Sequence, residues 1–293
     1  MDATKMKRVL VTGASGFTGR HACALFAGMG YTVYGLVRKP TMMKDVTLVP
    51  CDIMDEQQVK RVVQEVNPDI TLHLAAQNHG GVAWEKPAFT FRINVLGTLN
   101  LLEALRICAP KSIILITGSV LEWNAGSQPA HPYGVSKLMQ TGLASSWSTL
   151  FGLDVRIARS SNLCGPGEST GICSLLARSC VEEKKAFHFS NILDQRDFLD
   201  VRDAVCAYER IIANGERGGN YTVASGRNRT LLEVARAIRD IAGSGITFST
   251  DLFQRTVQEL YPAVETRGLG WEPAIPFTQT LEDIHDYMKT TKR

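Results

Sequence analysis

Short apolar runs rich in β-branched residues alternate with longer amphipathic segments along the first half of the chain. The apolar runs predict strands at residues 7–12, 31–37, 69–76, 112–117 and 153–158. Several of these runs are almost continuously apolar, which is typical of strands covered on both faces. The amphipathic segments predict helices near 18–29, 55–66, 86–108 and 133–150. This alternation predicts an α/β fold built on a doubly wound parallel sheet, with ligands at the carboxyl ends of its strands.

The alternation of strands and helices loosens after about residue 160. A loop rich in Gly and Pro occupies residues 162–171, and a turn with the sequence ANGERGGN follows at 213–220. No internal repeat and no low-complexity segment interrupts the chain. We expect the last third to supply insertions and a small cap, not an independent fold.

Composition narrows the classes of protein that this chain can be. The 293 residues are 44% hydrophobic and 21% charged, which allows one large domain or a large and a small one. The net charge of +3 is spread without a Lys/Arg block, so we expect no nucleic-acid or anionic-membrane partner. A small anionic ligand stays possible. No apolar run reaches the roughly 18 residues of a membrane span, and no signal-peptide core follows the first residues, so a cytoplasmic protein is expected.

The cysteines point to packing and not to metal chemistry. There are seven, an odd number, with no CxxC pair and no histidine spacing suited to zinc. We therefore expect reduced thiols and no metal site.

A glycine-rich segment, VTGASGFTGRH at 11–21, lies between the first predicted strand and the first predicted helix. Gly13, Gly16 and Gly19 would let backbone N–H groups and a helix N-terminus approach a pyrophosphate, where a side chain would collide. The same spacing also occurs as a purely structural turn. Its position between strand and helix favours dinucleotide binding.

The end of the second predicted strand indicates which dinucleotide is bound. An acid here would bind the ribose 2'-hydroxyl of NAD, but the chain has Val37, followed by Arg38 and Lys39. Two cations suit a 2'-phosphate, so NADPH is expected, although cations in a loop can also be merely solvated. Asp52 would lie after the third strand, near the adenine.

Tyr133 and Lys137 stand four residues apart and so share one face of a predicted helix. An ammonium group beside a phenol favours its ionisation, so Tyr133 could exchange a proton near neutral pH. Ser119 lies at the tip of the preceding strand, where its hydroxyl could bind the same substrate oxygen. These three residues are the candidate catalytic group.

The chain resembles the extended short-chain dehydrogenase/reductase family, in its nucleotide-sugar epimerase, dehydratase and reductase branch. The resemblance rests on segments that fall in the family's order over nearly the whole chain: TGASGFTG, CDIMD, HLAAQ, INVLGTLNLLEA, PYGVSK, NLCGPGE, RDFLDVRDAV and GLGWEP. It implies a Rossmann domain that binds NAD(P), a smaller C-terminal domain for a nucleotide-diphosphate sugar, and a homodimer formed through the Tyr133 helix and its neighbour.

The resemblance also implies domain boundaries and a cofactor site. The Rossmann domain is expected at 1–162, with 190–225 returning to it, and the substrate domain at 163–189 and 226–293. The residues expected to contact NADPH are Gly13, Ser15, Gly16, Phe17, Thr18, Gly19, Arg38, Lys39, Asp52, Ile53, Leu74, Ala75, Ala76, Thr117, Tyr133 and Lys137.

By the same resemblance each member of the catalytic group has a role. Tyr133 gives a proton to the developing alkoxide and Ser119 holds that oxygen. Lys137 lowers the pKa of Tyr133 and binds the nicotinamide ribose. Asn94 is expected to order the water or backbone next to Lys137.

The residues after Ser119 distinguish the reactions within the branch. Sugar 4,6-dehydratases carry a base here, and the epimerase-reductases that make GDP-fucose carry a cysteine, but this chain has Val120 and Leu121. Glu122 comes one step later and would point to the other face of an extended segment. The sequence therefore looks most similar to the GDP-4-keto-6-deoxy-mannose reductases, which reduce a C4 carbonyl. A nucleotide-sugar 4-epimerase and a non-catalytic NADP sensor are the alternatives.

A last group is expected to contact the substrate. Asn162 and Arg196 match positions that contact the diphosphate in the family, and Arg255 or Arg267 would add a second cation. Each arginine could instead form a surface salt bridge. His79 flanks the expected sugar pocket, although a lone histidine is more often structural.

Overall fold

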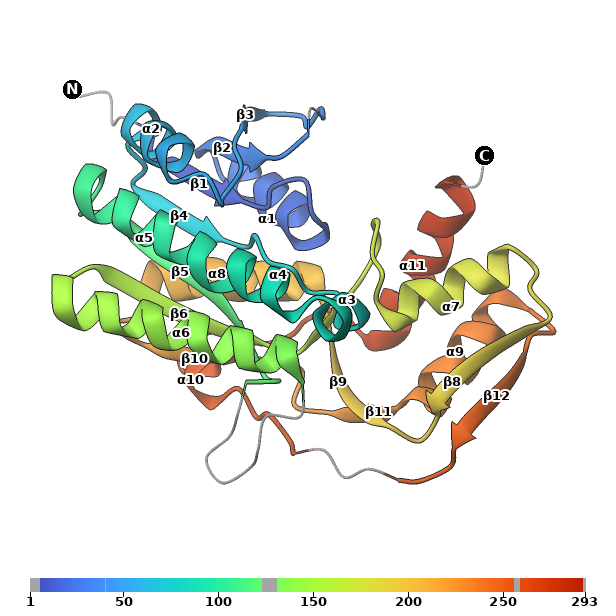
Figure 1. Ribbon diagram of the computed structural model, residues 1–293. Coiled ribbons are helices and arrows are strands. Elements are labelled where there is room, and N and C mark those ends of the chain that lie inside the picture. Colours follow the sequence, from blue (N-terminus) through green and yellow to red (C-terminus); the bar gives the residue numbers. More distant parts are fainter. Residues whose placement is uncertain (1–5, 40, 123–130, 256–258, 292–293) are drawn as a thin grey trace. The chain divides into compact units, whose positions relative to one another are not determined.

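The computed structural model describes residues 6–39, 41–122, 131–255 and 259–291 (Figure 1). Residues 1–5, where we expect no signal-peptide core, lie outside this part. The chain divides into two compact units, each described separately below. Unit 1 comprises Met1–Arg159, Val205–Tyr221 and Gly268–Gly270, and unit 2 comprises Ser160–Ala204, Thr222–Arg267 and Trp271–Arg293.

A seven-stranded sheet forms the centre of unit 1, with the order β10-β6-β5-β4-β1-β2-β3. Its strands are β1 (Arg8–Thr12), β2 (Thr32–Val37), β3 (Val46–Pro50), β4 (Ile70–His73), β5 (Ile113–Ser119), β6 (Asp154–Ser160) and β10 (Asn220–Val223). The run from β5 through β4, β1 and β2 to β3 is parallel. The predicted doubly wound fold is confirmed, and β1 and β4 lie side by side where the strand order reverses.

Both faces of this sheet are buried. The helices of unit 1 are α1 (Phe17–Gly28), α2 (Glu56–Val66), α3 (Gly80–Glu85), α4 (Pro87–Phe91), η1 (Arg92–Leu96), α5 (Gly97–Cys108), α6 (Pro132–Phe151) and most of α8 (Val201–Asn214). Leu10 and Ile114 pack in one apolar cluster with Leu101 of α5. Val9 and Leu115, which point to the opposite face because strand side chains alternate, are fully buried too.

The single helix expected at 86–108 is divided into three parts. One wide π turn, η1, separates α4 from α5. Such turns inside helices are frequent at functional sites, and this one contains the buried side chain of Asn94.

Unit 2 has an apolar core of its own. It contains a three-stranded sheet, β11-β9-β7, and a two-stranded sheet, β12-β8. Its elements are β7 (Asn162–Cys164), α7 (Ile172–Val181), β8 (Ala186–Asn191), β9 (Gln195–Asp200), β11 (Asn228–Thr230), α9 (Leu231–Ala242), β12 (Thr247–Leu252), α10 (Val264–Arg267) and α11 (Phe277–Thr291). Leu176, Phe198, Val234 and Ile284 pack together from four of these elements.

The division also differs from the predicted boundaries. We expected 190–225 to return to the first domain, but only 205–221 belongs to unit 1. Strand β9 pairs with β7 and β11 of unit 2 instead.

Within the described ranges, no helix has the length and apolar character needed to cross a membrane. In the same part of the chain, no group of three or more His, Cys, Asp and Glu side chains is placed to hold a metal ion.

Candidate active site

The glycine-rich loop turns tightly between β1 and α1 because three positions lack a side chain. Gly13 has a φ of +69°, and a Cβ there would lie 2.9 Å from the Cα of Ala75, just beyond β4. A Cβ on Gly19 would collide with the Gly13 carbonyl. The Gly16 N–H donates to that carbonyl at 2.9 Å. The loop is therefore held against the end of β4.

Helix α1 begins at this loop with its N-terminus free of side chains that would block an anion. Gly16 is the N-cap, makes no side-chain capping bond, and no acid lies in the first turn. Ser15 and Gly16 are exposed, and Phe17 and Thr18 are half-buried. Free backbone N–H groups and the positive end of a helix suit a pyrophosphate, so these residues fit a dinucleotide.

The predicted 2'-phosphate contacts are available at the end of β2. Val37 is buried, while Arg38 and Lys39, directly after it, are exposed. Asp52 and Ile53 follow β3. The Asp52 carboxylate is exposed and accepts from the Met54 N–H at 2.9 Å, while the Ile53 side chain is buried.

Lys137 is buried in α6, and its ammonium group donates two hydrogen bonds within the protein. Its Nζ donates to the Thr117 carbonyl on β5 and to Gln140 Oε1, both at 2.6 Å. Burial lowers the pKa of Lys137 to about 8, an effect that the negative charge of Glu122 opposes. The ammonium is therefore held at the end of β5 before any ligand binds.

A chain of buried polar groups continues from Gln140 across the sheet. Gln140 Nε2 donates to Thr98 Oγ1 at 2.9 Å, and Thr98 Oγ1 lies 2.8 Å from His73 Nε2. His73 Nδ1 lies 2.7 Å from Thr12 Oγ1. Burial, with the charge of Lys137, lowers the pKa of His73 to about 3, so its ring is neutral. We refer to Thr12, His73, Thr98, Gln140 and Lys137 as the buried polar chain.

Sequence reasoning missed the inner members of this chain. Thr98 is a polar residue on a face of α5 that otherwise buries mostly apolar side chains, and this mismatch could have identified it, since a buried polar group needs a partner. The buried face of α6 is mostly polar and small, so the sequence carries no such signal for Gln140.

Tyr133 forms a side-chain hydrogen bond with Ser119, as the candidate catalytic group requires. Burial raises the pKa of Tyr133 well above its usual value, and the charge of Glu122 and the Tyr208 hydroxyl add to this, while the Ser119 bond opposes it. The expected lowering of this pKa is therefore wrong for the chain alone. Lys137 instead directs its ammonium at Thr117 and Gln140.

The segment after Ser119 is a turn, not an extended strand. The Glu122 N–H donates to the Ser119 carbonyl at 3.1 Å, and the Leu121 N–H donates to Ser119 Oγ at 3.1 Å. The expectation that Glu122 points away is thus wrong. Its carboxylate accepts from the Ser119 N–H at 2.7 Å, from Thr141 Oγ1 at 2.9 Å and from Arg159 Nε at 2.8 Å.

Asn94 connects the loop after β4 to α6. Its Nδ2 donates to the Gln77 carbonyl at 3.1 Å and to Ser136 Oγ at 2.9 Å, and its Oδ1 accepts from the Gln77 N–H at 2.8 Å. Ser136 is the neighbour of Lys137 in sequence. The described side-chain bonds of Asn94 therefore reach the hydroxyl of the residue next to Lys137, and none of them reaches the lysine itself.

His79 has a structural contact in the loop after β4. Its Nδ1 accepts from the Val82 N–H at 3.3 Å and caps α3. Trp84, on the same helix, is 61% exposed and lies edge-on to His131, with ring centroids 5.4 Å apart. His131 in turn caps α6 by accepting from the Tyr133 N–H at 3.0 Å.

The other predicted substrate residues lie in unit 2. Asn162 Nδ2 donates to the Asp197 carbonyl at 3.1 Å on the adjacent strand. Arg196 lies at the start of β9, 3.7 Å from Asp194, in a partly exposed ion pair, and opposite Arg229 of β11.

The two later arginines differ in their surroundings. Arg267 is 3.6 Å from Glu272, and its buried Nε has no hydrogen-bond partner among the described residues. Arg255 is exposed in the segment after β12. No described contact joins either of them to Arg196.

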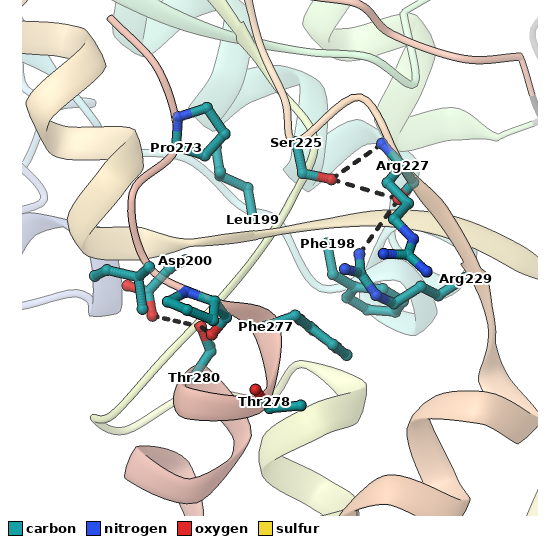
Figure 2. A pocket seen from close by; sticks show the side chains of 12 residues that line it. Phe198, Leu199, Asp200, Ser225, Arg227, Arg229, Pro273, Phe277, Thr278 and Thr280 are labelled. Carbon is teal, nitrogen blue, oxygen red and sulfur yellow. Dashed lines mark hydrogen bonds between the residues drawn. The ribbon is translucent and has the colours of Figure 1, made fainter.

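A cavity of about 500 Å³ in unit 2 holds two cations that sequence reasoning missed (Figure 2). Arg227 and Arg229 line it together with Ser225 and, from the start of α11, Phe277. The Arg229 guanidinium lies 4.2 Å from the centre of the Phe277 ring. The buried Asp197 carboxylate accepts from the backbone N–H groups of Ser225, Gly226 and Arg227, which fixes this turn.

Comparisons with known proteins agree with this geometry. The NAD dependent epimerase/dehydratase family matches residues 9–224. The GDP-6-deoxy-D-mannose reductase of Pseudomonas aeruginosa is 31% identical, over 95% of this chain and 96% of that protein. The structure of RMD from Pseudomonas aeruginosa complexed with NADPH has a TM-score of 0.82 and 29% identity, covering 98% of this chain and 100% of that one.

A second solved structure shows the breadth of these relatives. The UDP-glucose 4-epimerase of Thermus thermophilus, in complex with NAD, has a TM-score of 0.85 and 25% identity, covering 96% of this chain and 99% of that one. The resemblance inferred from the motifs is confirmed. The chain belongs to the NAD dependent epimerase/dehydratase family, within the extended short-chain dehydrogenase/reductases.

Proposed function

We propose that this protein reduces the C4 carbonyl of a nucleotide-activated 4-keto-6-deoxyhexose with NADPH. The observation that carries the proposal is the Tyr133–Ser119 hydrogen bond at the carboxyl end of β5. Beside this pair, Val120 and Leu121 are aliphatic, and the Glu122 carboxylate is occupied by three donors. Such a site can transfer a proton to a carbonyl oxygen but holds no free base in this turn for a neighbouring carbon.

The cofactor site supports NADPH. The N-terminus of α1 fits the pyrophosphate, and Arg38 and Lys39 would meet the 2'-phosphate with charge-assisted bonds. NADPH would supply the hydride to C4. Its ribose hydroxyls would be bound by Lys137, whose ammonium already lies at the end of β5.

Two protein side chains would stabilise and protonate the C4 oxygen of the substrate. As C4 gains the hydride, the carbonyl oxygen becomes an alkoxide, which Ser119 stabilises by a hydrogen bond. Tyr133 transfers its phenolic proton to this oxygen. The raised pKa of Tyr133 keeps the phenol protonated, the form that a proton donor needs for reduction. Solvent returns a proton to Tyr133 after product release.

The substrate would be a GDP-sugar with its diphosphate on cations of unit 2. This choice rests on the 31% identity to a GDP-6-deoxy-D-mannose reductase. Arg196 and the cavity arginines Arg227 and Arg229 supply positive charge around one strand pair. Guanidinium groups bind phosphate oxygens in pairs of parallel hydrogen bonds, which suits a diphosphate.

We also propose a homodimer through α5 and α6, as the resemblance implies. Apolar side chains stand exposed on these two helices, including those of Ile107, Met139 and Leu150. Gathered apolar exposure on neighbouring helices is typical of a contact surface. Light scattering of the purified protein would give twice the chain mass.

The function is tested with GDP-, dTDP- and UDP-linked 4-keto-6-deoxy sugars, NADPH and purified protein. NADPH oxidation is followed by absorbance, and the product is identified by NMR. We expect reduction of the GDP-linked substrate at C4. Interconversion of nucleotide hexoses at C4 without net NADPH use would instead show a 4-epimerase, the activity of the Thermus relative. Elimination from a hexose that keeps its C6 hydroxyl would also contradict the proposal.

A further inference from the structure

We propose that Glu122 is a positioning residue whose carboxylate fixes Ser119 against helix α6, so that the serine hydroxyl meets the Tyr133 phenol. We call Glu122, Thr141 and Arg159 the carboxylate anchor of Ser119. The inference deepens the proposed function, because the reaction it serves is the proton transfer at Tyr133.

The carboxylate anchor joins three elements at one point. One oxygen of Glu122 accepts from the Ser119 backbone N–H at the end of β5, at 2.7 Å. The other accepts from Thr141 Oγ1 on α6, at 2.9 Å, and from Arg159 Nε on β6, at 2.8 Å. Tyr133 also lies on α6. By binding both the Ser119 backbone and α6, the carboxylate fixes the distance between the Ser119 and Tyr133 hydroxyls.

Two glycines leave the space that this arrangement needs. A Cβ on Gly118 would collide with the Glu122 carboxylate oxygen, and a Cβ on Gly134 would collide with the Leu121 carbonyl. Gly118 thus lets the carboxylate fold back over the strand, and Gly134 lets the first turn of α6 pack on the Ser119–Glu122 turn. The close fit on both sides fixes the turn relative to the helix.

The charge of Glu122 is placed to act on the site as well. The side chain is only 4% exposed, and Arg159 is its paired cation. A charge buried in this way acts over several ångströms with little screening. It raises the pKa of both Tyr133 and Lys137, and so favours the protonated phenol that reduction consumes.

The test compares four variants with wild type. Glu122→Gln keeps one acceptor for the Ser119 N–H but no charge, and Glu122→Leu keeps neither. Gly118→Ala does not change the residue at position 122, but its new Cβ should displace the Glu122 carboxylate. Glu103→Gln is the matched control, because Glu103 on α5 likewise binds an arginine, Arg106, and an indole N–H.

We expect kcat to fall in the order wild type, Glu122→Gln, Glu122→Leu. The loss should reach roughly 100-fold, since misplacing a reacting group by about 1 Å can cost that much. The substrate KM and the NADPH dissociation constant should change less than about threefold, because Ser119 and Tyr133 act on the transition state. Gly118→Ala should resemble Glu122→Gln, and Glu103→Gln should match wild type.

The pH profile separates positioning from a general loss of structure. Among the described residues, the titratable side chains that face Tyr133 include Glu122 after β5, Tyr208 of α8 and, within its own helix, the capping ring of His131. Removing the one carboxylate among them should move the alkaline limb of kcat to lower pH in Glu122→Gln. A purely structural defect would lower kcat at every pH and leave the limb unmoved.

A second readout does not depend on the reaction. Amide hydrogen exchange of residues 116–122 should accelerate in Glu122→Leu and not in Glu103→Gln. Wild-type kcat in Glu122→Leu, a change confined to KM, or unchanged exchange would overturn the inference. If the wild type reduces no 4-keto sugar, the proposed function fails, and the exchange comparison still decides whether Glu122 holds the Ser119 turn.

Discussion

At the scale of single residues, the candidate catalytic group is held by a few short contacts. Ser119 accepts from the Leu121 N–H at 3.1 Å and bonds to Tyr133, so its hydroxyl is oriented before a substrate arrives. Lys137 is held by two bonds of 2.6 Å. Fixed donors of this kind stabilise a developing charge without having to reorganise.

Replacing Ser119 should affect chemistry and not cofactor binding. Ser119→Ala removes one preorganised donor, so kcat should fall by roughly 10²-fold or more. Tyr133→Phe should be worse, because it removes the proton as well. Steady-state kinetics and NADPH titration by fluorescence measure both effects. An unchanged kcat in Ser119→Ala would remove this residue from the mechanism.

Changing the end of β2 should change the choice of cofactor. In the double variant Val37→Asp, Arg38→Asn, the new carboxylate repels a 2'-phosphate and one cation is lost. Each charge-assisted contact contributes about 1.5 to 3 kcal/mol, so preference should move toward NADH by roughly tenfold or more. The ratio of kcat/KM with NADH to kcat/KM with NADPH measures this preference. A wild type that binds NADH as tightly as NADPH would contradict this interpretation of the loop.

At the scale of elements, the ends of β1, β4 and β5 are joined by the buried polar chain. The ring of His73 is fully buried and bonds to a threonine at each nitrogen. It connects β1, through Thr12, to α5, through Thr98. The buried polar chain thereby holds Lys137 through Gln140, while the carboxylate anchor holds the Ser119 turn.

The neutral ring of His73 should make folding sensitive to acid. Its pKa is about 3 in the fold and 6.5 for the free side chain, so the unfolded chain binds a proton first as the pH falls. Stability from this group is complete above pH 6.5 and is lost between about 6.5 and 3. The slope is about 1.4 kcal/mol per pH unit for one proton.

The measurement is urea unfolding of wild type and His73→Gln at several pH values in this window. The variant should be less stable near neutral pH but should lose stability less steeply as the pH falls. His188→Gln is the control, since His188 is exposed on unit 2 and contacts only the exposed Ser249 and Asp251 side chains among its described polar partners. Equal slopes in wild type and His73→Gln would show that His73 does not titrate as described.

At the scale of the whole molecule, the chain builds two compact units with separate cores. The residues predicted to contact the cofactor lie in unit 1, while the cavity arginines lie in unit 2. We therefore predict that changes to the two sets of residues act on different ligands.

Arg229→Met should weaken binding of the nucleotide sugar and leave NADPH binding unchanged. Loss of one guanidinium contact to phosphate should raise KM by roughly tenfold or more. Arg239→Met is the control, because Arg239 on α9 also lies over an aromatic ring, that of Phe248, but outside the cavity. Calorimetric titration of GDP and of NADPH separates the two ligands. Equal losses for both ligands would contradict this division of roles.

Features that depend on local order along the chain could be predicted from the amino-acid sequence. The alternation of apolar runs and amphipathic segments predicted the strands and helices around the sheet, and the glycine spacing predicted the turn at Gly13. Tyr133 and Lys137 were found because they lie four residues apart on one helix. These signals are readable because helix and strand periods are fixed by the backbone.

Contacts between polar groups that are far apart in the sequence became visible in the fold alone. We expected Glu122 to point away on an extended segment, but the turn brings it to Thr141 and Arg159. The tyrosine pKa, expected to fall beside Lys137, rises because the fold buries the phenol. Burial and long-range hydrogen bonds depend on how elements pack, and one-dimensional spacing does not encode that packing.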